Sequence, residues 1–394
     1  MQFTGLTISV CAVLCGIWPI TSSAQEEAPV SVAQDAPASV PSAAGYHKGF
    51  FVRDPGSPFD MHIQGRVQVR YTSESHEGAR NEAAFSIARA RLGLSGRAFI
   101  DNLKYKFQAD FGKGAVTLKD YFVDYGLLAN TLHLRVGQWK RPFSRQQITS
   151  SGRLELVDRA ITDKFFGAGR DIGIAIHNNY ESSPTFEYAL GVFNGTGDKP
   201  HLSGDVSVDP ATGEGEITGG GFSNVPTHFH PALVMRLGYN YGGIKGYQEA
   251  DLEGGPLRFS IGGSALADFD TDDDNRSGVR GEVDYVVKLR GLSTTGGFYV
   301  ASSQAGNAFS DQSLAAIGMH LQVGYLALGR IQPVVRYAVI DPDGEDNEQQ
   351  EMLAGIAVYF FEHGLKWQTD GGALVYAAGN RTDMLLRTQL QLAF

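Results

Sequence analysis

Basic side chains recur at every second position in several segments of the chain. Arg89 and Arg91 are two residues apart, and Arg66 and Arg70 are four apart. Successive side chains of a strand point to opposite faces, so each pair lies on one face. A guanidinium group matches the oxygens of a phosphate or a carboxylate with two parallel hydrogen bonds. The set that we assign to such faces, as a candidate anion pathway, is Arg66, Arg70, Arg89, Arg91, Arg97, Lys104, Lys106 and Arg135.

Acidic residues on similar faces leave a second role open for this basic set. Cross-strand pairs of opposite charge are common in sheets, so each arginine can instead be an ion-pair partner. The acidic residues in question are Asp110, Asp120, Asp124, Glu282 and Asp284. On the early strands the bases outnumber the acids, and the surplus must face water or anions. In a lumen with low-dielectric walls, such a surplus lowers the free energy of anions along the whole path.

The elements that hold these residues are predicted as strands with one apolar and one polar face. From Met384 to Phe394, apolar residues alternate with Arg387, Gln389 and Gln391. The same period recurs in about sixteen segments, among them 62–71, 85–99, 104–111, 120–125, 132–136, 279–290, 316–325, 332–339, 352–360 and 365–377. A soluble two-sheet protein would have to bury one face against another sheet. Because one face here carries Arg, Lys, Gln and His, the pattern favours lipid outside and water inside.

The lengths of the connections indicate how these strands are joined. Short joints such as 100–102, 128–131, 290–291, 328–330 and 362–364 alternate with longer polar segments at 73–82, 141–170, 195–230, 270–277 and 341–349. Short turns at one end and long loops at the other are typical of outer-membrane barrels, although 242–256 is a long connection at the short end. We predict an all-β, transmembrane antiparallel β-barrel of about 16 strands around an aqueous channel. A soluble all-β exported protein is the alternative.

The N-terminal region carries export signals rather than a domain. Residues 6–20 are apolar and uncharged, and Ser22-Ser-Ala24 resembles a cleavage site, although no Lys or Arg precedes the apolar stretch. Both cysteines lie inside this segment, so the mature chain has none for disulfides, thiolate metal sites or catalysis. We therefore expect a signal peptide over 1–24, a flexible Ala/Pro/Ser-rich periplasmic lead over 25–58, and a barrel domain over 59–394.

Motifs for other chemistry are incomplete. Asp268-Phe-Asp-Thr-Asp272 has the spacing of a calcium loop, but Asp273 stands in place of the required glycine and Val279 in place of the closing glutamate. His201, His228 and His230 have no partner at metal-ligand spacing. The chain contains no nucleophile elbow, phosphate loop or zinc helix. We expect no enzyme activity, no cofactor, no metal and no nucleic-acid partner.

Several segments in this order resemble the phosphate-selective porins of the O and P type. They are Ile87-Ala-Arg-Ala-Arg-Leu-Gly-Leu94, Lys119-Asp-Tyr-Phe-Val-Asp-Tyr125, Val136-Gly-Gln-Trp-Lys-Arg-Pro-Phe-Ser-Arg145, Leu156-Val-Asp-Arg159, Gly169-Arg-Asp-Ile-Gly173 and Tyr188-Ala-Leu-Gly-Val-Phe-Asn-Gly195. The resemblance implies a trimeric barrel in a Gram-negative outer membrane, in contact with lipid and lipopolysaccharide, that passes small anions such as phosphate. It also implies that the third long loop folds into the lumen. This constriction loop would carry Arg141, Arg145, Arg153, Arg159, Lys164 and Arg170.

Preference for phosphate over other anions does not follow, because the lysines that line the constriction in selective members have no counterpart identifiable here by motif. Within the channel interpretation, an anion-preferring porin and a non-selective general-diffusion porin remain alternatives. An outer-membrane enzyme or binding barrel, in which the long loops do the work, is the third.

Overall fold

The computed structural model describes residues 43–394, apart from 48, 129–130, 199–200, 209–214, 227–228, 230, 270–277 and 308–309. Nearly all regular structure in these residues is β-strand. The strands of the main sheet that form its wall are β3 (Asp60–Ser75), β4 (Glu82–Ala98), β5 (Ile100–Asp110), β6 (Thr117–Leu128), β7 (Leu132–Lys140), β8 (Arg170–His177), β9 (Phe186–Phe193), β12 (Ala232–Tyr241), β13 (Arg258–Asp268), β14 (Gly278–Leu289), β15 (Leu292–Asn307), β16 (Ser310–Tyr325), β17 (Ile331–Pro342), β18 (Gln349–Phe361), β19 (Leu365–Tyr376) and β20 (Arg381–Ala393).

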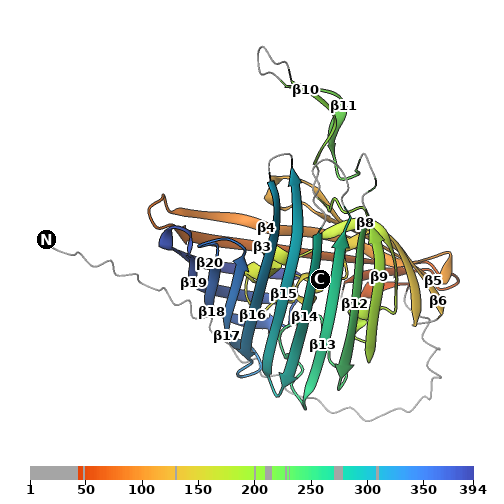
Figure 1. Ribbon diagram of the computed structural model, residues 1–394. Coiled ribbons are helices and arrows are strands. Elements are labelled where there is room, and N and C mark those ends of the chain that lie inside the picture. The colour runs from red at the N-terminus through yellow and green to blue at the C-terminus, as the bar shows by residue number, and fades with distance from the viewer. Residues whose placement is uncertain are drawn as a thin grey trace, which may run out of the picture. The chain divides into compact units, whose positions relative to one another are not determined.

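These strands close into a barrel because the two ends of the series pair with each other. Each strand is antiparallel to the next one in the chain, and β9 pairs with β12 across the intervening segment. The last strand then pairs with the first, with Leu390 opposite Val69. The seven strands β3–β9 and the nine strands β12–β20 give sixteen, as the alternation predicted (Figure 1).

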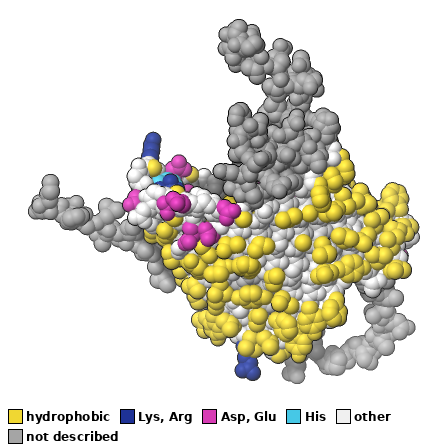
Figure 2. All heavy atoms as spheres, in the orientation of Figure 1, with side chains coloured by type: hydrophobic (Ala, Val, Ile, Leu, Met, Phe, Trp, Pro, Cys, Tyr) yellow, Lys and Arg dark blue, Asp and Glu magenta, His cyan; other side chains and the backbone are white. Residues whose placement is uncertain are grey.

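The apolar faces of the strands point outward and the polar faces point inward. On β20, Met384, Leu386 and Leu390 are each about half exposed, whereas Arg387 and Gln389 are 4% and 1% exposed. Exposed apolar side chains on other strands, such as Ile261, Leu321 and Ile356, repeat this inversion, and Figure 2 shows hydrophobic side chains over the face of the wall that it draws. A soluble protein buries its apolar face, so this arrangement suits a wall in contact with lipid and a polar interior.

The C-terminal residue completes the wall at the junction of β20 and β3. Phe394 and Gly65 exchange two backbone hydrogen bonds of 3.0 Å. The Phe394 ring covers the position where Gly65 lacks a side chain, because a Cβ there would lie 2.3 Å from the ring. Glycine at this position therefore lets the aromatic ring pack closely against the neighbouring strand.

The described part of the expected N-terminal lead pairs with the barrel. β1 (Ala44–Tyr46) and β2 (Phe50–Arg53) form a hairpin, and β2 continues onto β3 with Phe50 opposite Ile63. Residues 44–46 and 50–53 are thus part of the sheet, although the sequence predicted a flexible lead there. The expected signal peptide at 1–24 lies outside the described residues.

The connections follow the predicted alternation. At one end, called here the short-turn end, most joints span a few residues; at the other, the long-loop end, lie the segments 76–81, 111–116, 141–169, 194–231 and 343–348. A separate two-stranded sheet, β10 (His201–Val208) with β11 (Gly215–Ser223), lies within 194–231. The helices are α1 (Arg145–Ile148), α2 (Ile161–Phe166), η1 (Gly112–Gly114), η2 (Tyr180–Ser182) and η3 (Ala378–Asn380). No helix in the described ranges has the length and apolarity needed to cross a membrane.

Candidate functional site

The connection between β7 and β8 folds into the lumen, as predicted. This segment, 141–169, is called here the inserted loop, and it contains α1 and α2. It contacts the opposite wall: the Arg145 guanidinium donates to Asp284 on β14 at 2.7 Å, and the Val157 amide donates to Asp370 on β19 at 2.8 Å. Gln391 on β20 donates to the carbonyl of Gly152 at 3.1 Å. The loop therefore crosses the channel rather than capping its mouth.

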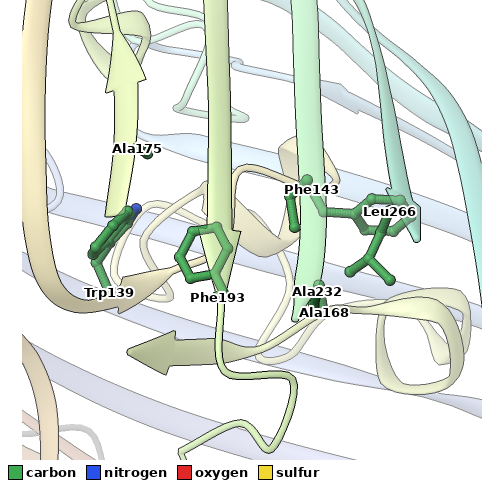
Figure 3. Packing of buried hydrophobic residues seen from close by; sticks show 8 residues of the cluster. Trp139, Phe143, Ala168, Ala175, Phe193, Ala232 and Leu266 are labelled. Atoms are coloured by element: carbon green, nitrogen blue, oxygen red, sulfur yellow. The ribbon is translucent and has the colours of Figure 1, made fainter. Parts of the chain in front are cut away.

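Apolar packing holds both ends of the inserted loop against the inner wall (Figure 3). Phe143 at its beginning and Ala168 at its end are buried with Trp139 of β7, Phe193 of β9 and Leu266 of β13. Phe143 is 0% exposed. Burying a phenylalanine contributes about 2 kcal/mol relative to leaving it in water, so this cluster fixes where the loop enters and leaves the wall.

Two basic side chains bind the C-terminal end of the short helix α1. The Lys140 ammonium donates to the carbonyls of Gln147, Ile148 and Thr149 at 2.6, 3.0 and 3.0 Å. Arg159 donates to the Thr149 carbonyl at 2.7 Å. Cations at the carbonyl end of a helix satisfy acceptors that have no partner inside it. Arg159, predicted as a constriction residue, thus also shapes the loop.

The inserted loop packs closely on the wall formed by β15–β20. Glutamine side chains there are fully buried and bind the loop backbone: Gln368 donates to the carbonyls of Leu154, Glu155 and Leu156. Buried polar groups with satisfied hydrogen bonds indicate a packed interface rather than a water-filled passage. Inward side chains that keep partial exposure lie on β3–β6, which adjoins this packed side where β20 pairs with β3.

On that side one carboxylate of the inserted loop is shared by three arginines. Asp158 lies 2.7 Å from Arg70, 3.2 Å from Arg89 and 3.7 Å from Arg387. Burial alone would raise the pKa of Asp158, but the three guanidinium charges and the hydrogen bond from Arg70 outweigh it and lower the pKa. Asp158 is therefore ionised. Because Arg387 also pairs with Asp370 at 2.7 Å, the three arginines face two acids and exceed them by one charge.

A similar excess of cations lies on β4–β6. Asp120 accepts from both Lys106 and Arg170 at 2.8 Å. Arg91 donates to Asp110 at 2.8 Å. The Lys106 side chain is still 32% exposed and Arg91 is 12% exposed. These ion pairs are partly open to water, so their cations stay accessible to a passing anion.

Two members of the predicted set have no carboxylate partner within the described residues. Arg66 donates to the Ser150 hydroxyl of the inserted loop at 2.9 Å. Lys104 is exposed on β5 and makes no ion pair with any residue that the structure describes. Their charges add directly to the positive potential of the lumen.

The other predicted residues divide between anchors and exposed positions. Arg97 pairs with Asp60 and Asp101, and Arg135 pairs with Asp124 and Glu181 while its guanidinium lies 4.2 Å from the Phe122 ring. Arg141 binds the Ala168 carbonyl and Asp171, and Arg145 binds Asp284. In contrast, Arg153 and Lys164 are exposed on the inserted loop. The structure thus brings together Arg66, Arg70, Arg89 and Arg159 around the loop, and leaves Arg97 and Arg135 in separate ion pairs.

Sequence reasoning missed the most buried ionic cluster. Arg236 on β12 is 0% exposed and lies within 3.2 Å of Glu187, Glu282 and Asp284. Glu282 and Asp284 had been considered as partners for the early arginines, yet they pair with Arg236 and Arg145. The alternation on β12 places Arg236 inward, which was the available signal.

No group of three or more His, Cys, Asp or Glu side chains in the described residues has the arrangement of a metal site. Of the calcium-like segment 268–272, residues 270–272 lie outside the described residues, as do His228 and His230.

The comparisons with known proteins agree with this geometry. Residues 61–240 match the family model described as phosphate-selective porin O and P. Over these residues the chain is similar to that family. The matched segment includes β3–β9, the inserted loop and all of the basic set. The family and the fold indicate a channel and not an enzyme.

Solved structures of porins share the fold at low sequence identity. The outer membrane channel DcaP of Acinetobacter baumannii is 14% identical, with a TM-score of 0.58 over 85% of this chain and 97% of that one. The anion-selective porin from Comamonas acidovorans is 13% identical, with a TM-score of 0.55 over 85% and 99%. OmpT of Vibrio cholerae in its trimer form is 10% identical, with a TM-score of 0.52 over 85% and 99%. Curated protein sequences gave no match to this chain.

Proposed function

We propose that the protein is an outer-membrane porin that passes small anions by passive diffusion, between the inserted loop and the wall of β3–β6. The sixteen-stranded barrel with a polar lumen provides the aqueous path. The inserted loop narrows that path and presents Asp158 and Arg159 to it. The family match over 61–240 and the fold of an anion-selective porin support the same function.

The preference for anions arises because basic side chains beside the passage outnumber the carboxylates that they share. Asp158 serves Arg70 and Arg89, since Arg387 has its own partner in Asp370, and Asp120 serves two cations. Arg66 and Lys104 have no acid among the described residues. If each cation had its own carboxylate the wall would be neutral, but here the cations are in excess and a net positive charge remains beside the passage. A permeating anion therefore meets a favourable potential and a cation an unfavourable one.

The reversal potential of single channels in a potassium chloride gradient tests this proposal. The double variant Arg66→Gln/Lys104→Gln removes two positive charges without leaving any carboxylate unpaired. We expect the reversal potential to shift toward cation permeation, and further neutralisation of Arg70, Arg89 and Arg91 to extend the shift. The matched control is Arg330→Gln, which removes an exposed arginine from the β16–β17 turn. An unchanged potential in the double and extended variants would exclude these residues from selectivity.

Phosphate is proposed as one permeating anion because the guanidinium groups of Arg70 and Arg89 lie together on one side of the passage, and such groups bind phosphate oxygens bidentately. Titration of inorganic phosphate into the same bilayer separates two outcomes. Block of chloride current at low phosphate concentration would indicate a phosphate site, whereas unaltered current would indicate a general anion channel.

A non-selective porin is the second candidate, and the acids at Asp110 and Asp120 favour it. Both are about one-tenth exposed beside the passage and reduce its positive charge. A reversal potential near zero in the wild-type protein would establish this candidate.

We also propose assembly as a homotrimer, contact with lipopolysaccharide at the long-loop end, and export through a signal peptide at 1–24. A trimeric OmpT structure of the same fold supports the first, and the apolar outer wall supports a membrane location. Mass determination of the native detergent complex tests the oligomeric state, and N-terminal sequencing of protein from outer membranes tests the cleavage site.

A further inference from the structure

The connection between β12 and β13 is unusually long for the short-turn end. It covers residues 242–257 and is called here the internal turn. Gly242 and Gly243 both have positive φ angles, of 72° and 69°, so the chain reverses sharply where it leaves β12. Five residues of this segment are almost completely buried, namely Ile244, Tyr247, Glu249, Ala250 and Asp251. A turn that only joined two strands in water would leave such side chains exposed.

Contacts on both sides of the barrel show that the internal turn crosses the lumen. Near β8 and β9, the Gly246 amide donates to the Ser183 hydroxyl at 2.9 Å, and the Tyr247 hydroxyl donates to Glu187 at 2.8 Å. Farther along the turn, Ala250 packs against Ala357 and Tyr359 of β18. Since β9 and β18 lie on different parts of the wall, the turn must pass through the interior between them.

The internal turn also contacts the inserted loop at three places. The Arg145 guanidinium donates to the Gly246 carbonyl at 3.2 Å and lies 5.0 Å from the centre of the Tyr247 ring. The Glu249 amide donates to the Arg153 carbonyl at 3.3 Å. The Glu155 amide donates to the Glu249 carboxylate at 2.8 Å. These contacts connect the two segments from α1 to the middle of the inserted loop.

Glu249 is the residue on which this connection depends most. Its carboxylate accepts from the Glu155 amide and from the Gln322 amide group at 3.0 Å, and the same Gln322 nitrogen donates to Glu155 at 2.7 Å. One carboxylate thus joins the internal turn, the inserted loop and β16. Glu249 is 5% exposed, so its removal would leave buried donors without an acceptor.

We infer that the internal turn is a second constriction element, which supports the inserted loop from the short-turn end and sets the size limit of the channel. Glu249 is its positioning residue, because it acts through the inserted loop rather than on the permeating solute. This inference rests on the channel function proposed above. It assigns the size limit to two segments, one from each end of the barrel, that meet at Glu249 and Glu155.

Liposome swelling and single-channel conductance of three variants test the inference. In the first, 242–258 is replaced by an Asn-Gly turn, which the pairing of Tyr241 with Phe259 permits. In the second, Glu249→Ala removes only the carboxylate, and therefore tests the contact if the shortened barrel does not fold. The control is Glu253→Gln in the same turn, whose carboxylate pairs with Lys245 and Arg258 and does not touch the inserted loop. Folding is checked by circular dichroism and heat-modifiable electrophoretic migration.

The expected result is higher conductance and faster entry of raffinose relative to arabinose for the shortened turn, with a smaller increase for Glu249→Ala and none for the control. Rescue by Glu249→Gln, which keeps an acceptor oxygen, would support positioning by hydrogen bonding. A folded shortened-turn variant with wild-type conductance and sugar discrimination would overturn the inference. Absence of conductance in the wild-type protein would instead refute the channel function on which the inference rests.

Discussion

We predict that the packed (closed) position of the inserted loop against the wall becomes less stable as pH rises, because of Glu155. Replacing Glu155 by glutamine should abolish this pH dependence. Glu155 is 1% exposed, and its carboxylate accepts from Ser293, from Gln322 at 2.7 Å and from Gln332 at 2.5 Å. Burial raises the pKa of Glu155 to about 7, and the charge of Glu249 acts in the same direction and outweighs the lowering effect of those hydrogen bonds. The closed loop therefore favours the protonated carboxyl.

The sign of the effect follows from the difference between the closed and the opened loop. In an opened loop the carboxyl has its ordinary pKa of 4.5. Below that pH both states hold the proton, and the free energy of opening does not change with pH. As pH rises from 4.5 to about 7, the opened loop loses the proton first, so the closed loop loses stability. Above that range the full loss, about 3 kcal/mol, is reached.

Hydrogen–deuterium exchange of peptides spanning 150–158, measured in detergent from pH 5 to 8.5 and corrected for intrinsic exchange rates, checks this prediction. In the wild-type protein the opening constant should rise on the order of a hundredfold across the range. Glu155→Gln should stay near the low-pH value throughout, and Glu249→Gln should remove part of the slope. Glu362→Gln, in the exposed β18–β19 turn, should behave like the wild type. A flat wild-type profile, or an unchanged slope in Glu155→Gln, would refute the reasoning.

Two further predictions concern the base of the inserted loop and the long-loop end. Phe143→Ala should destabilise the inserted loop by about 3–4 kcal/mol, because it leaves a cavity among Trp139, Phe193 and Leu266, while the barrel stays folded. Limited proteolysis within 141–169 and open-channel current noise measure this effect. Protection from proteolysis equal to that of the wild type would contradict the prediction. The hydrogen bond from His76 to Asp383 raises the pKa of His76. The bond between the first long-end connection and β20 should therefore be complete below pH 6.5 and be lost as pH rises through the raised value. Titration of the His76 ring by NMR checks this, with Asp383→Asn expected to return the pKa toward 6.5.

The barrel was predictable from sequence because its two faces meet different solvents along every strand. Leu386 faces lipid and Arg387 faces the lumen, so apolar and polar residues alternate with a period of two along β20. The inserted loop was predictable from its length and from the resemblance of flanking segments such as 136–145. In both cases the information lies in residues that are close together in the chain.

Pairing inside the lumen was not predictable, because the partners depend on the path of a segment with no periodic pattern. Arg70 could have paired with any inward acid on a neighbouring strand, yet it pairs with Asp158, which reaches it only because the loop crosses the channel. Arg145 pairs with Asp284 for the same reason, although the two residues are 139 positions apart in the sequence.

The internal turn shows where a local signal existed but lacked its context. Its length was noted as an irregularity, and it contains Tyr247, Glu249 and Asp251, whose polar groups need partners wherever they are buried. The sequence cannot say whether water or protein supplies those partners. Only the closed barrel brings Gln322 and the Glu155 amide to Glu249, 73 and 94 residues away. A long connection at the short-turn end of a barrel is therefore a candidate for a segment that folds into the lumen. This holds when the connection contains apolar or aromatic residues next to ionisable ones. The Glu249→Ala variant is the direct measure of whether such a contact controls the passage.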